Sequence, residues 1–244
     1  MGLSIGVLII GSLYWEPSRE SWRRERLRMN EVFPVCAPIR YGRQSEKRGN
    51  TYTMVFSRGC EPGAAIVVRC KADVEAAADL ITEAEHLWTA ERNEAPNGRI
   101  SANWGRVTLL MRPGADIPKV ILDAWAARVA AERGYRDVPQ AAGEGSLVSR
   151  QGILQITWPV QVDSGKDVPV DLLIATATEP SLTGQPPQYP EPERIAEAWR
   201  NDKADNVRYF RNNRKGGICT FQDEAINRLL NNGCLGSLAG LVRP

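Results

Sequence analysis

The chain has 244 residues, with 31 Lys and Arg against 29 Asp and Glu, which gives a formal charge of +2 at pH 7. Its 43% hydrophobic and 25% charged residues are typical of a globular protein, and this excludes a disordered chain or a small disulfide-stapled scaffold. A charge so close to zero argues against nucleic acid as the main partner, because neutralising phosphates needs a pronounced basic excess.

Side chains that bind transition metals are scarce. The sequence has one histidine, His86, and five cysteines without a CxxC pair, at positions 36, 60, 70, 219 and 234. We therefore expect no metal site, and free thiols in a reducing compartment. The apolar run at residues 5–10 is far shorter than the roughly 20 residues that span a bilayer. A cytoplasmic protein without a membrane partner is the expectation.

The first half of the chain predicts both strands and helices. The apolar residues 5–10 predict a buried strand that ends at Gly11-Ser12. Residues 19–28 carry five arginines, for which a solvated amphipathic face is expected. Residues 51–58 and 64–70 flank a Glu-Pro-Gly turn and predict a β-hairpin.

A helix is predicted at residues 73–91, because apolar residues recur there at three- and four-residue steps: Val74, Ala77, Ile81, Ala84 and Trp88. Later patterns predict a strand at 107–111, a helix from 117 to about 134, strands at 153–160 and 170–177, an extended proline-rich loop at 183–192, and helices at 193–200 and from Thr220. Residues 140–146 are the best candidate for a flexible connection. These elements do not alternate strictly, and they predict an α+β (mixed α/β) fold.

Common catalytic motifs are missing from the sequence. A hydroxyl or thiol nucleophile with an imidazole base would have to use His86, which lies off the apolar stripe of its helix. There is no GxxxxGK[ST] loop and no GxGxxG after a strand, so the sequence offers no recognisable cofactor site.

A general base, in contrast, can be proposed from the helix pattern. Continuing the apolar stripe by three residues from Trp88 leads to Glu91, whose carboxyl is thereby expected to be partly desolvated. Desolvation raises the pKa of a carboxyl toward the value that a base needs at neutral pH. Glu85, at the edge of the same face, is the second candidate, and Glu83 ranks below both.

The segment Ile10-Gly11-Ser12-Leu13, at the end of the first strand, presents backbone N–H groups without bulky side chains, which suits a carboxylate or a carbonyl oxygen. Together with Tyr14-Trp15-Glu16-Pro17 it resembles the Tyr-Gly-Ser-Leu loop of the gamma-glutamylcyclotransferase superfamily, and most of all its glutathione-specific branch. Two further similarities follow in the right order. One comprises Arg40 or Arg43, Ser45, Arg48 and Gly49; the other comprises Tyr189-Pro190, Arg194-Ile195-Ala196, Asn206, Tyr209-Phe210 and Gly217-Ile218.

The resemblance implies a single cyclotransferase-like domain over residues 1–244, with a barrel-type sheet, surrounding helices and an enlarged middle segment at about 93–146. It implies a cofactor-free intramolecular acyl transfer, of acyltransferase or lyase type, that releases 5-oxoproline from a small γ-glutamyl amine or peptide such as glutathione. In this hypothesis the loop at residues 10–13 binds substrate, Glu91 or Glu85 is the base, and Arg43 or Arg48 pairs with a substrate carboxylate.

Two other functions stay open. The family's loop tyrosine is replaced by Ile10, and its Leu-Asp-x-x-Glu-Gly motif is reduced to Leu87 and Glu91, which fits a non-catalytic binding or regulatory protein with the same fold. The arginines of residues 19–28 and 40–48 fit, less well, a nucleotide- or RNA-binding protein. The leaving group and the oligomeric state are open at the level of sequence.

Overall fold

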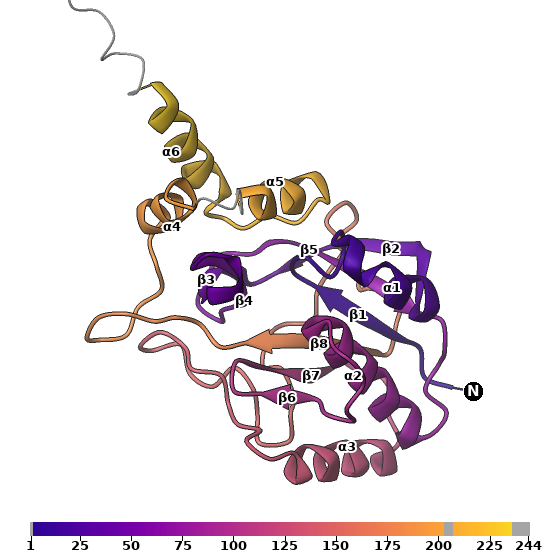
Figure 1. Ribbon diagram of the computed structural model, residues 1–244. Helices are drawn as coiled ribbons and strands as arrows, with labels where there is room; N and C mark the ends of the chain where they lie inside the picture. Colours follow the sequence, from indigo (N-terminus) through magenta and orange to yellow (C-terminus); the bar gives the residue numbers. More distant parts are fainter. Residues whose placement is uncertain (1, 203–206, 236–244) are drawn as a thin grey trace, which may run out of the picture.

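The computed structural model of the protein describes residues 2–202 and 207–235 (Figure 1). Asn206, which belongs to the third similarity, lies outside the described residues. The described chain is a mixed α/β structure, as the sequence predicts, with a six-stranded sheet, a separate strand pair and six α-helices.

The six-stranded sheet is mixed and open. Its strands, in spatial order, are β2 (Leu27–Ala37), β5 (Gly63–Cys70), β1 (Ile5–Ile9), β8 (Leu172–Thr178), β7 (Gly105–Met111) and β6 (Ser101–Ala102). Among the paired strands described, only β1 and β8 run parallel, with Leu8 opposite Ala175. All five residues of β1 are buried, which explains why its sequence is a continuous apolar run.

The predicted hairpin of residues 51–58 and 64–70 is wrong. β4 (Thr51–Phe56) pairs with β3 (Ile39–Ser45), whereas β5 lies between β1 and β2 in the large sheet. The apolar run of β5 is buried and takes a partner on each edge, and distant parts of the chain supply both partners. The strands β2 and β3 were not predicted, since polar side chains interrupt their apolar pattern.

Residues 153–160 do not form the predicted strand, because they make only isolated bridges, such as those of Ile153 with Leu109 and Leu154 with Val148. Residues 140–146, expected to be a flexible connection, form an irregular segment in which Glu144 accepts a hydrogen bond from Ser57 at 2.9 Å. The strands at 107–111 and 170–177 are confirmed as β7 and β8.

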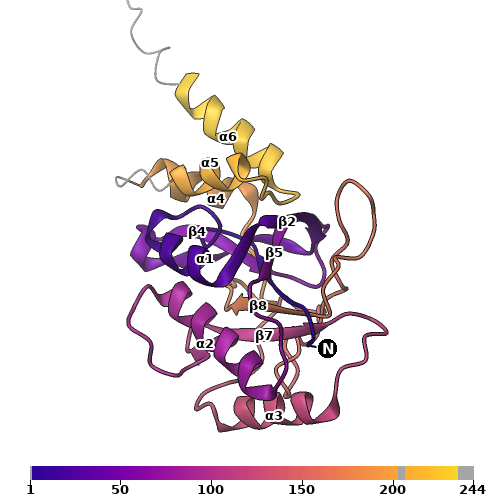
Figure 2. The ribbon, with the colours of Figure 1, turned by 90° about the vertical axis from the view of Figure 1, so that its right-hand side faces the viewer.

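The helices lie around the sheet. They are α1 (Glu20–Arg26), α2 (Ala77–Arg92), α3 (Lys119–Ala131), α4 (Pro192–Arg200), α5 (Val207–Lys215) and α6 (Asp223–Leu235). The helix predictions are confirmed, although α2 begins four residues after its predicted start, because Val74 forms an isolated β-bridge with Leu3 instead. α2 packs on β7 and β8 and against α3, while α4, α5 and α6 gather at the opposite end of the molecule (Figures 1 and 2).

Among the described residues, none of the helices has both the length and the apolar character needed to cross a bilayer. Buried apolar side chains from the sheet and the helices form one large cluster, which includes Trp88 and Trp125.

Gly63, at the start of β5, lies where the sheet contacts the C-terminal segment. A Cβ atom there would lie 2.2 Å from the Cys219 carbonyl oxygen, while the next residue, Ala64, exchanges two backbone hydrogen bonds with Cys219. We expect Gly63→Ala to lower the free energy of unfolding by about 1–3 kcal/mol in urea denaturation. Glu61→Ala, in the exposed turn just before, should change it by less than about 0.5 kcal/mol; equal effects would contradict this packing.

Candidate active site at the end of the parallel strands

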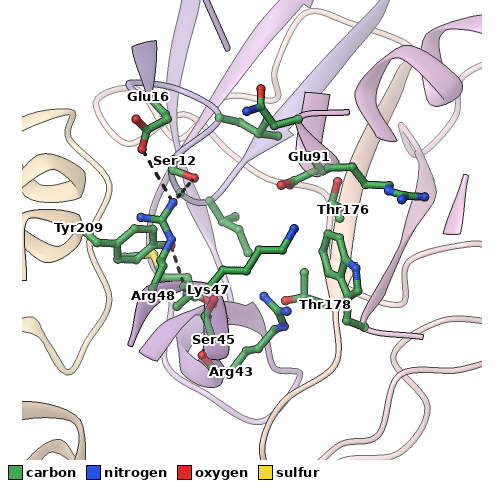
Figure 3. A pocket seen from close by; sticks show the side chains of 18 of the residues that line it. Ser12, Glu16, Arg43, Ser45, Lys47, Arg48, Glu91, Thr176, Thr178 and Tyr209 are labelled. Carbon is green, nitrogen blue, oxygen red and sulfur yellow. Dashed lines mark hydrogen bonds and ion pairs between the residues drawn. The ribbon is translucent and has the colours of Figure 1, made fainter. Parts of the chain in front are cut away.

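A cavity of about 1110 Å³ opens at the carboxyl ends of β1 and β8. Because these two strands are parallel neighbours, the loop after β1 and the last residues of β8 lie at the same edge of the sheet. The end of α2, the 3-10 helix η2 (Glu46–Arg48) and Tyr209 of α5 also line the cavity (Figure 3).

The structure brings most of the predicted site residues together. Glu91 lines the cavity, and so do all six predicted binding residues: Ile10, Gly11, Ser12, Leu13, Arg43 and Arg48. Glu85 does not line it, because six residues of helix rotate a side chain by about 240° from the direction of Glu91. Its carboxylate instead lies 3.5 Å from Arg128 Nη2 of α3. The lower-ranked Glu83 is buried in an ion pair with Arg26.

Glu91 is half-buried, and its carboxyl points into the cavity with the Thr176 hydroxyl beside it (Figure 3). Burial raises the pKa of this carboxyl above its ordinary value of 4.5. Arg19, Arg43, Arg48 and the Thr176 hydroxyl act in the opposite direction, since each stabilises the ionised form. Desolvation is the larger effect, so Glu91 holds a proton more readily than a solvated glutamate does.

The loop after β1 turns sharply while leaving several N–H groups unused. The Tyr14 N–H donates to Gly11 O at 3.2 Å, and the Trp15 and Glu16 N–H groups both donate to Ser12 O, at 3.2 and 2.8 Å. Within the described chain, the N–H groups of Gly11, Ser12 and Leu13 donate to no protein acceptor. Consecutive free N–H groups of this kind can bind an anion or a developing oxyanion.

Arg43 presents a guanidinium whose hydrogen-bond donors are unused. It has no ion pair or side-chain hydrogen bond with any residue the structure describes, and its Cζ lies 4.8 Å from the centre of the Trp104 ring. Trp104 in turn stacks on Trp88 of α2, with 4.8 Å between ring centres. Burial lowers the pKa of Arg43, which nevertheless stays charged near neutral pH. A planar cation held on an aromatic stack is suited to a carboxylate.

Arg48 is engaged with the protein itself. Its Nη2 donates to Ser12 Oγ at 3.3 Å and lies 3.8 Å from Glu16 Oε2, and its Cζ is 4.9 Å from the centre of the Tyr209 ring (Figure 3).

The arginine-rich segment is less solvated than predicted. Arg23 Nη1 donates to Leu13 O at 2.8 Å and to Glu16 O at 3.0 Å, which fixes the loop from a second side. Arg19 donates to Glu91 O at 3.3 Å. Two of these arginines therefore support the cavity wall.

Sequence reasoning missed Thr176, Trp104 and Lys47 as cavity residues. Thr176 belongs to a predicted strand and Trp104 to a polar stretch, and neither carries a local signal of a site. The ammonium group of Lys47 points into the cavity (Figure 3). Tyr209, quoted above only for its resemblance, forms part of the wall.

Among the residues that the structure describes, no group of three or more His, Cys, Asp and Glu side chains is placed to hold a metal ion. Comparisons with protein-family models, with curated proteins and with solved structures gave no match to this chain. Function is therefore inferred from the geometry of the site and from the sequence resemblance.

The approach of Tyr209 to the loop explains why residue 11 is glycine. A Cβ at Gly11 would lie 2.6 Å from Tyr209 Oη but 3.5 Å from Tyr209 Cζ. We expect Gly11→Ala to lower the melting temperature, and Tyr209→Phe to restore most of that loss in the double variant, because Phe lacks the clashing oxygen. Additive losses in the double variant would show that the two residues are not in contact.

The raised pKa of Glu91 also predicts a dependence of stability on pH. Between 4.5 and the higher native pKa, the folded protein keeps a proton that the unfolded chain has released, so stability falls as pH rises through this window. Gln is neutral at every pH. The free energy of unfolding of Glu91→Gln, relative to the wild type, should therefore increase from about pH 4 to about pH 8 in urea denaturation. A difference that does not vary with pH would contradict the raised pKa.

Proposed function

We propose that the protein is a gamma-glutamylcyclotransferase-like enzyme that releases 5-oxoproline from a γ-glutamyl amine or peptide. The observation that carries the proposal is the meeting of two groups in one cavity: the half-buried carboxyl of Glu91, with its raised pKa, and the free N–H groups of Gly11, Ser12 and Leu13. The sequence resemblance names the reaction to which these groups are suited.

In the proposed reaction the α-amine nitrogen of the substrate attacks its own γ-carbonyl carbon and forms the C–N bond of a five-membered ring. Glu91 accepts a proton from the attacking amine. The loop N–H groups stabilise the oxyanion that develops on the carbonyl oxygen. The bond to the departing amine then breaks, and Glu91 returns the proton to it, so that atoms and charges balance without a further reactant.

Arg43 is the proposed partner of the substrate carboxylate, because its donors are free and its orientation is fixed by Trp104. A two-point grip on the carboxylate and the carbonyl would hold the α-amine near the carbonyl carbon, and such positioning lowers the barrier to ring closure.

We further propose that the large sheet, with the β3–β4 pair beside β5 and β8, corresponds to the barrel-type sheet of the family. A cytoplasmic location belongs to the same proposal. The free thiols of the four cysteines whose side chains are described support it, since oxidising compartments favour disulfides.

The test is to incubate the protein with γ-glutamyl peptides, glutathione included, and to measure 5-oxoproline. Glu91→Gln should reduce kcat by about 10²–10⁴, because it keeps the shape of the side chain and removes the base. Glu85→Gln is the matched control: it lies on the same helix but outside the cavity, and should keep turnover close to that of the wild type.

Unchanged turnover in Glu91→Gln would refute the assignment of the base. If the wild type binds γ-glutamyl peptides in calorimetry without releasing 5-oxoproline, the enzyme proposal fails and the non-catalytic binding protein takes its place.

A further inference from the structure

The two arginines that the sequence could not tell apart, Arg43 and Arg48, lie in different chemical settings. Arg43 faces the cavity with unused hydrogen-bond donors. Arg48 already contacts a hydroxyl, a carboxylate and an aromatic ring of the protein. Arg48 Nη2 is already used by Ser12 and Glu16, so a substrate carboxylate would compete with Glu16 for this guanidinium, whereas Arg43 has no such competitor among the described residues.

The contacts of Arg48 fall on the two ends of one turn. The Glu16 N–H donates to Ser12 O at 2.8 Å, and Arg48 contacts the Ser12 hydroxyl at 3.3 Å and the Glu16 carboxylate at 3.8 Å. Arg48 therefore closes the turn a second time, through side chains. Residues 11–13, which carry the free N–H groups, lie within this turn or directly before it. The shape of the turn therefore sets the direction of these N–H groups.

Arg48 is itself held in place. The 3-10 helix η2 ends at this residue, and the Arg48 carbonyl accepts a hydrogen bond from Thr51 Oγ1 at 2.7 Å. The guanidinium lies against the ring of Tyr209, whose hydroxyl is in turn within 3.4 Å of the Met54 nitrogen. Arg48 and Glu16 each expose only 21% of their side chains, so solvent weakens their ion pair less than it would on an open surface.

We propose that Arg48 is a positioning residue, which holds the N–H groups of Gly11, Ser12 and Leu13 toward the reacting oxygen, and that Arg43 alone of the two binds the substrate carboxylate. The catalytic part of this inference rests on the proposed function. The structural part, that Arg48 restrains the loop, stands independently of it.

The structural part is tested by amide hydrogen exchange of residues 14–16, whose N–H groups are hydrogen-bonded within the turn, in the wild type, Arg48→Ala, Arg48→Lys and Ser12→Ala. Exchange should be at least about tenfold faster in Arg48→Ala. It should be intermediate in Arg48→Lys, which keeps a charge for Glu16 but loses the planar fork. Ser12→Ala is the mildest change, and should accelerate the same amides. Arg43→Ala is the matched control, for which exchange in the loop should stay as in the wild type.

The catalytic part is tested with two substrates, a γ-glutamyl peptide and its analogue in which the α-carboxylate is an α-carboxamide. Arg48→Ala should lower kcat by at least about tenfold on both substrates with little change in KM, because weakened stabilisation of the oxyanion acts on the transition state. Arg43→Ala should raise KM on the carboxylate substrate and have little effect on the carboxamide.

Unchanged exchange of residues 14–16 in Arg48→Ala would overturn the proposal. So would an Arg48→Ala loss that disappears on the carboxamide, because Arg48 would then bind the carboxylate. A third outcome separates the two parts: Arg48→Ala speeds exchange in the loop, but the wild type releases no 5-oxoproline. The restraint by Arg48 would then be established, and the proposed function would be refuted.

Discussion

The parallel pairing of β1 with β8 is the constraint on which the candidate site depends. With Leu8 opposite Ala175, both strands end at the same edge of the sheet, so the loop from Gly11 lies close to Thr176 and Thr178. α2 packs on β7 and β8, and its last turn brings Glu91 to that edge. If β8 ran antiparallel to β1, Thr176 and Thr178 would lie at the other end of the sheet, away from the loop and from the Glu91 carboxyl.

The binding capacity of the cavity depends on which of its arginines already have partners in the protein. Several arginines surround it, and most are used by the protein itself: Arg23 and Arg48 hold the loop after β1, and Arg19 contacts the end of α2. Arg43 is left with unused donors and rests on an aromatic stack that continues to Trp88, three residues before Glu91 on α2. The same stack therefore braces a candidate binding group and the helix that carries the candidate base.

The charge state of Glu91 follows from a balance inside this cavity. Nearby guanidinium groups favour its ionised form, yet removal from water has the greater effect and raises its pKa. Because its pKa is raised, the Glu91 carboxylate is a stronger base than the carboxylate of a solvated glutamate. The proposed acid–base role thus depends on packing as much as on the identity of the residue.

Local patterns in the sequence determined the buried strand at residues 5–10, the helix that carries Glu91 and the glycine turn at the end of the first strand, because apolar periodicity and glycine act over a few residues. They could not determine which strands pair. β5 takes β1 and β2 as neighbours, and β4 takes β3, through contacts between residues far apart in the chain. Helix periodicity ranked Glu91 ahead of Glu85 and separated their directions, but only the tertiary structure placed Arg128 beside Glu85 and the cavity beside Glu91. The difference in bonding between Arg43 and Arg48 was likewise decided by the tertiary structure alone, since the groups that contact Arg48 come from the loop after β1 and from α5.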